Sequence, residues 1–325
     1  MSRRHGKISS VREPTIARDT ERRAGVIDTL SAGYATVNRH PWILTVPVLL
    51  DLFFWLGPHL SMRPLVERYF GANLVPTGLS ADVLQAYEQA RETVIRAGDS
   101  FNLFTLLVAH FPGIPSLMAA RDGAGPSLDV ADSGILLAAL FLLPVLGLGL
   151  AAVYYVTVGM PVIGSVKGAA AVAGRAWRTW VRLVAFMLMV LAFGFLVGVP
   201  TGVLVLLFGG PEGSLAGFMG AFLSVVALWT LFYLFFVVDA MVVSDVGPFH
   251  AMRNSIAVVR SNTGSTLGLA VLIWIITLGM PLVWDAIAQN AAGIVVGILG
   301  NAYIASGLAV ASMTFYRDRF AALNR

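Results

Sequence analysis

The sequence predicts an all-α membrane protein with six transmembrane helices, cytoplasmic interfacial amphipathic helices and one long outer loop. Of the 325 residues, 57% are hydrophobic and only 12% are charged, a balance that a water-soluble core and its surface do not accommodate. Six apolar stretches reach the roughly 20 residues that a helix needs to cross about 30 Å of hydrocarbon. They lack the alternation of barrel strands, so helices are expected to satisfy the backbone in lipid.

The six predicted spans set the domain organisation. They cover residues 41–60, 134–159, 183–208, 215–243, 267–286 and 292–315. Residues 24–320 then form one membrane domain, in which residues 61–133 are an outer helical loop between the first two spans. The basic residues 1–23 are predicted to be a disordered cytoplasmic tail, and residues 321–325 a second cytoplasmic tail.

The distribution of Lys and Arg predicts the orientation. Of 22 such residues only five lie in the outer loop, namely Arg63, Arg68, Arg91, Arg96 and Arg121. The others flank the spans on the opposite side, so we expect a multi-pass protein of the cell membrane (plasma or inner) with both termini in the cytoplasm. Residues 1–23 lack a signal-peptide apolar core, so the first span should be an uncleaved anchor. Anionic headgroups at the cytoplasmic face explain the net charge of +4 better than nucleic acid does.

Three segments have apolar residues at helical spacing with basic residues between them, which predicts helices in the cytoplasmic interface. They are residues 26–37, 166–180 and 249–259. GVIDTLSAGYATVNRH can be laid over GPFHAMRNSIAVVRSN without gaps. The chain can thus be divided into three units, each an interfacial helix followed by a span up and a span down.

The outer loop is predicted to contain two features. Residues 80–97 should form an amphipathic helix capped by Ser80, with an apolar face that needs a partner. We expect Val83, Leu84, Val94 and Phe104 to pack on the outer ends of the spans or on another protein. Residues 102–120 are apolar but interrupted by prolines, which predicts an interfacial or re-entrant hairpin.

Asp51 is the strongest candidate for a functional residue. It lies ten residues beyond Pro41, about 15 Å deep and close to the bilayer midplane. Asn301, at a similar depth in the last span, is a candidate partner. A buried carboxylate there is either a hydrogen-bonded link between helices or a site for a proton, a cation or a polar substrate. The sequence leaves both alternatives open and favours the structural one.

Glycines at four-residue spacing suggest close helix packing in two spans. They are Gly194, Gly198 and Gly202 in the third span, and Gly293 and Gly297 in the sixth. Small residues let helix backbones approach within the bilayer. Packing within the chain is favoured over dimerisation.

Motifs for catalysis are missing from the sequence. The chain has no Cys, no phosphate-binding glycine loop, no HExxH and no GxSxG, and its five His residues are scattered. We therefore predict no catalytic residue, no metal site and no cofactor.

The run FFVVDAMVVSDVGPFHAMRNSIAVVRSNTGSTLGLAVL resembles a signature of six-helix membrane proteins that include the membrane domain of glycerophosphoryl diester phosphodiesterases. The matching residues are Asp239, Gly247, Pro248, Ala251, Ser255, Arg260 and Asn262. The resemblance implies a stand-alone membrane domain, because the soluble phosphodiesterase barrel is missing here. From its position near the cytoplasmic end of the fourth span, Asp239 is expected to pair with Arg253 or Arg260, or to cap the helix that follows.

Taken together, the sequence favours a non-catalytic membrane scaffold or accessory subunit of a transport or envelope-lipid system. Its partners would be membrane lipids and a second membrane protein or a further copy of the chain. The alternative is a transporter or channel that uses Asp51 as its proton or cation site. A weaker third class is a lipid-modifying enzyme, which a lateral groove lined by polar groups would favour.

Overall fold

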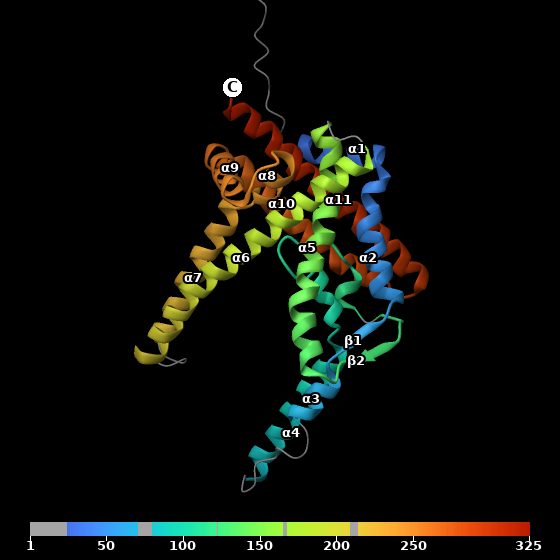
Figure 1. Ribbon diagram of the computed structural model, residues 1–325, viewed down its shortest axis with the longest axis vertical. Helices are drawn as coiled ribbons and strands as arrows, with labels where there is room; N and C mark the ends of the chain where they lie inside the picture. The colour runs from blue at the N-terminus through green and yellow to red at the C-terminus, as the bar shows by residue number, and fades with distance from the viewer. Residues whose placement is uncertain (1–24, 71–79, 122, 165–167, 209–213) are drawn as a thin grey trace, which may run out of the picture.

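The computed structural model describes residues 25–70, 80–121, 123–164, 168–208 and 214–325, and it is all-α as predicted (Figure 1). The predicted disorder of residues 1–23 lies outside this range.

The helices are α1 (Val26–Arg39), α2 (Thr45–Leu56), α3 (Arg63–Phe70), α4 (Ala81–Ser100), α5 (Ser133–Ile163), α6 (Ala169–Phe208), α7 (Ser214–Tyr233), α8 (Val237–Val243), α9 (Pro248–Ser261), α10 (Thr263–Ile287) and α11 (Ala291–Leu323). Short 3₁₀ turns are η1 (Pro41–Leu44), η3 (Leu103–Leu107) and η4 (Met118–Ala120), and strands β1 (His59–Ser61) and β2 (Ser127–Asp129) pair in parallel.

Within the described residues, five helices are long and apolar enough to cross a membrane, which indicates a membrane protein. They are α5, α6, the run Ala216–Val243 through α7 and α8, α10 and α11. The predicted first span differs, because the apolar helix Pro41–Leu56 is shorter. Its last residue precedes Gly57 and Pro58, and a residue before proline is disfavoured in the helical conformation. Six full-length spans are therefore not confirmed.

Two of the three predicted interfacial segments form separate helices, α1 and α9. Each has 14 residues and begins directly after a glycine, Gly25 or Gly247, as the gapless overlay requires. The middle segment does not form its own helix, because α6 continues through it for 40 residues. Its sequence AAAVAGRAWRTW contains no proline that would end a helix before the span.

Helix α11 lies at the centre of the bundle and packs against α1, α2, α5, α8, α9 and α10. The approach of α1 is closest at Gly33, where a Cβ atom would lie 2.5 Å from the carbonyl oxygen of Gly307. Two buried tyrosines also tie α11 to its neighbours. The Tyr154 hydroxyl lies 3.2 Å from Ser306 Oγ, and the Tyr316 hydroxyl lies 2.8 Å from Ser244 Oγ.

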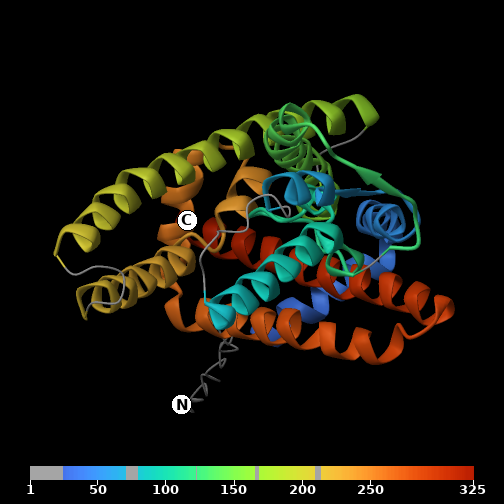
Figure 2. The same cartoon turned by 90° about the horizontal axis from the view of Figure 1, so that it is seen from below.

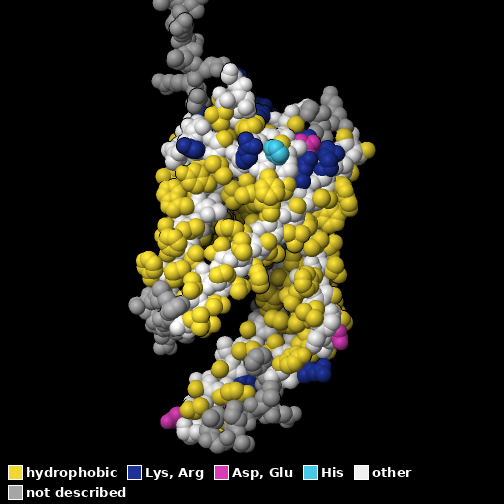
Figure 3. Space-filling model, turned by 60° about the vertical axis from the view of Figure 1, so that its left-hand side comes forward, with side chains coloured by type: hydrophobic (Ala, Val, Ile, Leu, Met, Phe, Trp, Pro, Cys, Tyr) yellow, Lys and Arg dark blue, Asp and Glu magenta, His cyan; other side chains and the backbone are white. Residues whose placement is uncertain are grey.

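The C-terminal half of α6 and the N-terminal half of α7 form an arm that stands away from the rest of the bundle, whereas the first half of α6 packs against α5 (Figures 1 and 2). Most of its apolar side chains have no cover from the chain; Phe195, for example, is 73% exposed. Figure 3 shows an apolar band below a row of Lys and Arg, hollowed beside the lower end of the arm. Such a surface suits contact with lipid or with another membrane protein.

The predicted packing of the α6 glycines within the chain is wrong. A Cβ atom built on Gly194, Gly198 or Gly202 would meet nothing within 4 Å, because the arm presents this face outward. In α11, both glycines have close neighbours within the chain, Gly293 at the turn from α10 and Gly297 in the outer loop. At Gly297 a Cβ atom would lie 2.8 Å from Leu117 Cδ2, and at Gly293 it would collide with the Ile287 carbonyl.

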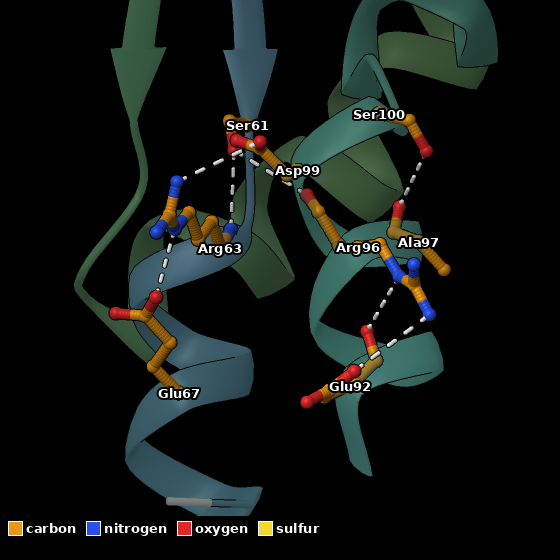
Figure 4. Close-up of polar contacts among 9 residues, drawn as sticks. Ser61, Arg63, Glu67, Glu92, Arg96, Ala97, Asp99 and Ser100 are labelled. Atoms are coloured by element: carbon orange, nitrogen blue, oxygen red, sulfur yellow. Dashed lines mark hydrogen bonds and ion pairs between the residues drawn. The ribbon is translucent and has the colours of Figure 1, made fainter. Parts of the chain in front are cut away.

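The outer loop forms a hairpin of α3 and α4 that projects from the bundle (Figure 1). Figure 4 shows its polar contacts: Arg63 pairs with Glu67 at 2.7 Å and with Asp99 at 3.7 Å, and Ser61 donates to the Gly98 carbonyl. The predicted packing holds for Phe104, whose ring lies 5.3 Å from that of Phe53. Val83, Leu84 and Val94 do not pack on the spans and remain exposed, because α4 packs mainly against the short α3. For these three residues, packing on another protein stays a prediction.

The two ends of the molecule differ in the elements that they carry. Helices α1 and α9 and the C-terminus lie at one end, and α3 and α4 lie at the other (Figure 1). Which of these ends faces the cytoplasm stays a prediction.

Candidate functional site

Asp51 anchors the outer loop inside the bundle. It lies in α2 and is fully buried. Its Oδ1 atom accepts hydrogen bonds from the Ser116 hydroxyl at 2.5 Å and the Met118 N–H at 3.0 Å, and Oδ2 accepts one from the Leu117 N–H at 3.1 Å. The carboxylate thus binds the backbone donors that open η4. Because both oxygens are occupied, Asp51 acts as a structural link in this arrangement.

The segment that Asp51 holds, residues 102–120, lies between helices. Leu103, Leu107 and Ile114 are buried, and the Gly113 carbonyl accepts a 2.9 Å hydrogen bond from the Tyr155 hydroxyl of α5. Gly147 of α5 permits the close approach of the Leu107 carbonyl, with which a Cβ atom would collide. Residues 102–120 thus form a plug of irregular backbone that packs between helices, whereas their predicted interfacial or re-entrant position in a membrane stays a prediction.

The predicted partner of Asp51 is different from the observed one. Asn301 is half-buried in α11, and the described hydrogen bonds of Asp51 all go to residues 116–118. These residues lie 65 to 67 positions away in a loop. Depth along the spans, which suggested Asn301, carries no information about such a contact.

Ser255 bridges a break in the helical run Ala216–Val243. Between α7 and α8 the chain turns at residues 234–236. The Ser255 hydroxyl of α9 donates to the Tyr233 carbonyl at 2.8 Å and accepts from the Phe236 N–H at 3.1 Å. One side chain therefore satisfies backbone groups that the break frees, as an interrupted membrane helix requires. Ala251, one turn earlier, is fully buried against the same region.

Asp239 follows this break by one turn and is 6% exposed. Its Oδ2 accepts a 2.5 Å hydrogen bond from Ser312 of α11. The expected ion pair with Arg253 or Arg260 is wrong for the described structure, in which no ion pair includes Asp239. Both arginines lie on the exposed face of α9, whereas Asp239 points into the bundle.

A cluster of charges that the sequence reading missed holds α6 against the turn before α9. Asp245, at φ 53°, pairs with Arg182, with Arg178 at 3.3 Å and with Arg175 at 3.9 Å. Burial alone would raise the pKa of Asp245, but the hydrogen bond and charge of Arg182, followed by Arg175 and Arg178, hold that pKa below its usual value. These arginines are three and four residues apart, which places them on one face of a helix. This spacing could have predicted the cluster from the sequence.

A cavity of about 870 Å³ lies beside Asp239. Its walls come from α5, α7, α8, α10 and α11, and residues 111–115 also line it. The polar side chains on its wall include Asp239, Ser312, Tyr154, Tyr155 and Thr263. Asp51 is not among the residues that line it.

No family model, curated protein or solved structure matches this chain. The resemblance to the membrane domain of glycerophosphoryl diester phosphodiesterases stays a prediction.

Proposed function

We propose that this chain is a non-catalytic integral membrane protein that acts as a scaffold or accessory subunit of a transport or envelope-lipid system. The observation that carries the proposal is the complete hydrogen bonding of Asp51 by residues 116–118. A coupling carboxylate must be free to meet its ion, whereas this one holds the plug in place. The resemblance to stand-alone membrane domains agrees with this role.

The exposed arm supports the scaffold part of the proposal. The three glycines of α6 face outward along a helix that the chain itself leaves largely uncovered. Glycines at this spacing allow a second helix to approach closely in lipid. A partner subunit or a further copy of the chain would use this face.

Flux measurements separate the scaffold from the transporter alternative. Asp51→Asn and Ser116→Ala each remove a hydrogen bond, but only Asp51→Asn removes the carboxylate. For a scaffold, proteoliposomes of wild type and both variants should show no pH-driven flux above that of empty liposomes. Robust wild-type flux that survives in Ser116→Ala and vanishes in Asp51→Asn would establish the transporter instead.

Substitution of the α6 glycines tests assembly. Gly198→Ile should leave the melting temperature unchanged, since nothing lies within 4 Å of the new Cβ atom. It should reduce the size of the assembly extracted from native membranes with a mild detergent. Gly279→Ile is the matched control, because Gly279 of α10 also has nothing within 4 Å. A wild-type chain that is already monomeric after such extraction would contradict a scaffold built on the arm.

We also propose that the end carrying α1, α9 and the C-terminus is cytoplasmic and that the protein lies in the cell membrane. The basic residues concentrated at this end support the orientation. A membrane-impermeant thiol reagent applied to intact cells should label a single Cys placed at Arg91, but not one placed at Arg253. Labelling at position 253 would reverse the orientation.

A further inference from the structure

The cavity beside Asp239 has the shape of a site for a long amphiphile. Lining residues on α10 extend from Thr263 to Thr277, which at about 1.5 Å per residue corresponds to about 21 Å along the helix. That length exceeds one leaflet's share of a hydrocarbon core about 30 Å thick. The walls are mostly apolar, and the volume falls within the range of about 300–1,000 Å³ common for small-molecule sites.

The cavity borders the surface that faces lipid. Trp229 and Leu228 of α7 and Trp274 of α10 line it, and all three are about half exposed. The two helices on which they lie belong to candidate spans. An amphiphile can therefore enter sideways from the bilayer, without passing through water.

The wall of the cavity carries a buried carboxylate that forms no ion pair with the part of the chain that the structure describes. Asp239 lines the wall and is more than nine-tenths buried. Among the described residues, it accepts a hydrogen bond from Ser312. The other aspartates near the bundle are fully occupied, Asp51 by three donors and Asp245 by three arginines. A buried carboxylate is costly unless a cation or several donors compensate it.

The local backbone fits a binding role. Asp239 follows the break between α7 and α8, where Ser255 replaces the lost helical hydrogen bonds. Interrupted membrane helices recur at substrate sites because they bring polar groups to membrane depth. The rings of Tyr154, Tyr155 and Phe235 line the same cavity, and aromatic faces attract ammonium groups.

We propose that this cavity binds an amphiphile with a protonated amine headgroup, which pairs with Asp239, while its apolar chain extends along α10 toward residues 111–115. The carboxylate selects the amine over hydroxyl or acidic headgroups of equal chain length. The apolar walls and the lateral opening select a molecule that partitions from the membrane. Neither Asp51 nor the glycines of α6 line this cavity, so the proposal does not rest on a role of the chain as a scaffold.

Three probes of equal chain length test the headgroup. Dodecylamine, dodecanol and dodecanoate are titrated against the full chain in a neutral detergent, with bound probe counted by native mass spectrometry. Dodecylamine should bind about tenfold more tightly than the other two, and Asp239→Asn should abolish that preference. Asp82→Asn is the control, because Asp82 is an exposed carboxylate on α4. Equal affinities for the three probes would overturn the proposal, as would an unchanged preference in Asp239→Asn.

A second variant tests the apolar part of the cavity and keeps the carboxylate. Ala309 lines the wall on α11, so Ala309→Phe places a ring in the space for the chain. Dodecylamine binding should fall about tenfold while the melting temperature stays within a few degrees of wild type. Where Asp239→Asn fails to fold, this variant decides the question. Full amine binding in a folded Ala309→Phe protein would show that the amine lies elsewhere and would overturn the proposal.

Discussion

Asp51 and Asp239 are both buried carboxylates on apolar helices, yet their surroundings differ in kind. Asp51 accepts three hydrogen bonds from one short segment and lines no part of the cavity. Asp239 accepts one from Ser312 and borders a cavity open to the lipid side. The first site is closed by its own chain, whereas the second has room for a group that the chain does not supply. Burial of an ionisable residue in a membrane protein therefore does not identify a functional site until its partners are known.

The largest effect is expected at Asp51. In Asp51→Asn only one oxygen remains to accept, so at least one buried donor of residues 116–118 faces an amide NH₂. Leaving a buried donor unpaired costs about 1–3 kcal/mol, and the free energy of unfolding should fall by that amount. Denaturant titration in detergent, followed by tryptophan fluorescence, measures the change. An unchanged stability would mean that the plug does not depend on this carboxylate.

An intermediate effect is expected at Asp245, whose carboxylate is held by cations instead of backbone donors. Asp245→Asn should lower the free energy of unfolding by about 1–2 kcal/mol at neutral pH, between the values for exposed and buried ion pairs. The folded pKa lies below the unfolded one, so the stabilisation is present above about pH 4 and is lost as the pH falls through the folded pKa. The gap between wild type and variant should narrow in acid. A gap that widens below pH 4 would contradict the assignment.

The smallest effect on the free energy of unfolding is expected at Asp239, although this residue, like Asp51, is buried. Asp239→Asn keeps the size of the side chain and an oxygen that accepts from Ser312, and it breaks no ion pair among the described residues. The free energy of unfolding should therefore change by less than about 1 kcal/mol in either direction. A loss as large as that of Asp51→Asn, measured by the same titration, would make Asp239 a second structural anchor and remove the contrast between the two sites.

The sequence predicts elements well where the signal is local. The helical fold and the positions of α1 and α9 follow from apolar length and from apolar residues at helical spacing. Contacts between distant segments were not predictable in the same way. The link from Asp51 to residues 116–118, the turn that Ser255 bridges, and the exposure of Gly198 all depend on how whole helices are placed. Charge proximity along the chain was also misleading, because it suggested arginine partners for Asp239 that point the other way.

The length of α6 has a consequence for the bilayer around the protein. Its 40 residues extend about 60 Å, twice a hydrocarbon core about 30 Å thick. Arg175, Arg178 and Arg182 occupy its first turns, and about 40 Å of helix remain beyond them. A stretch of this length fits within the core only if it is strongly tilted from the membrane normal. Figure 1 shows α6 running obliquely past α5. The tilt of α6 is therefore expected to change with membrane thickness. Because Arg182 of α6 contacts Asp245, a change in that tilt would move the turn that precedes α9.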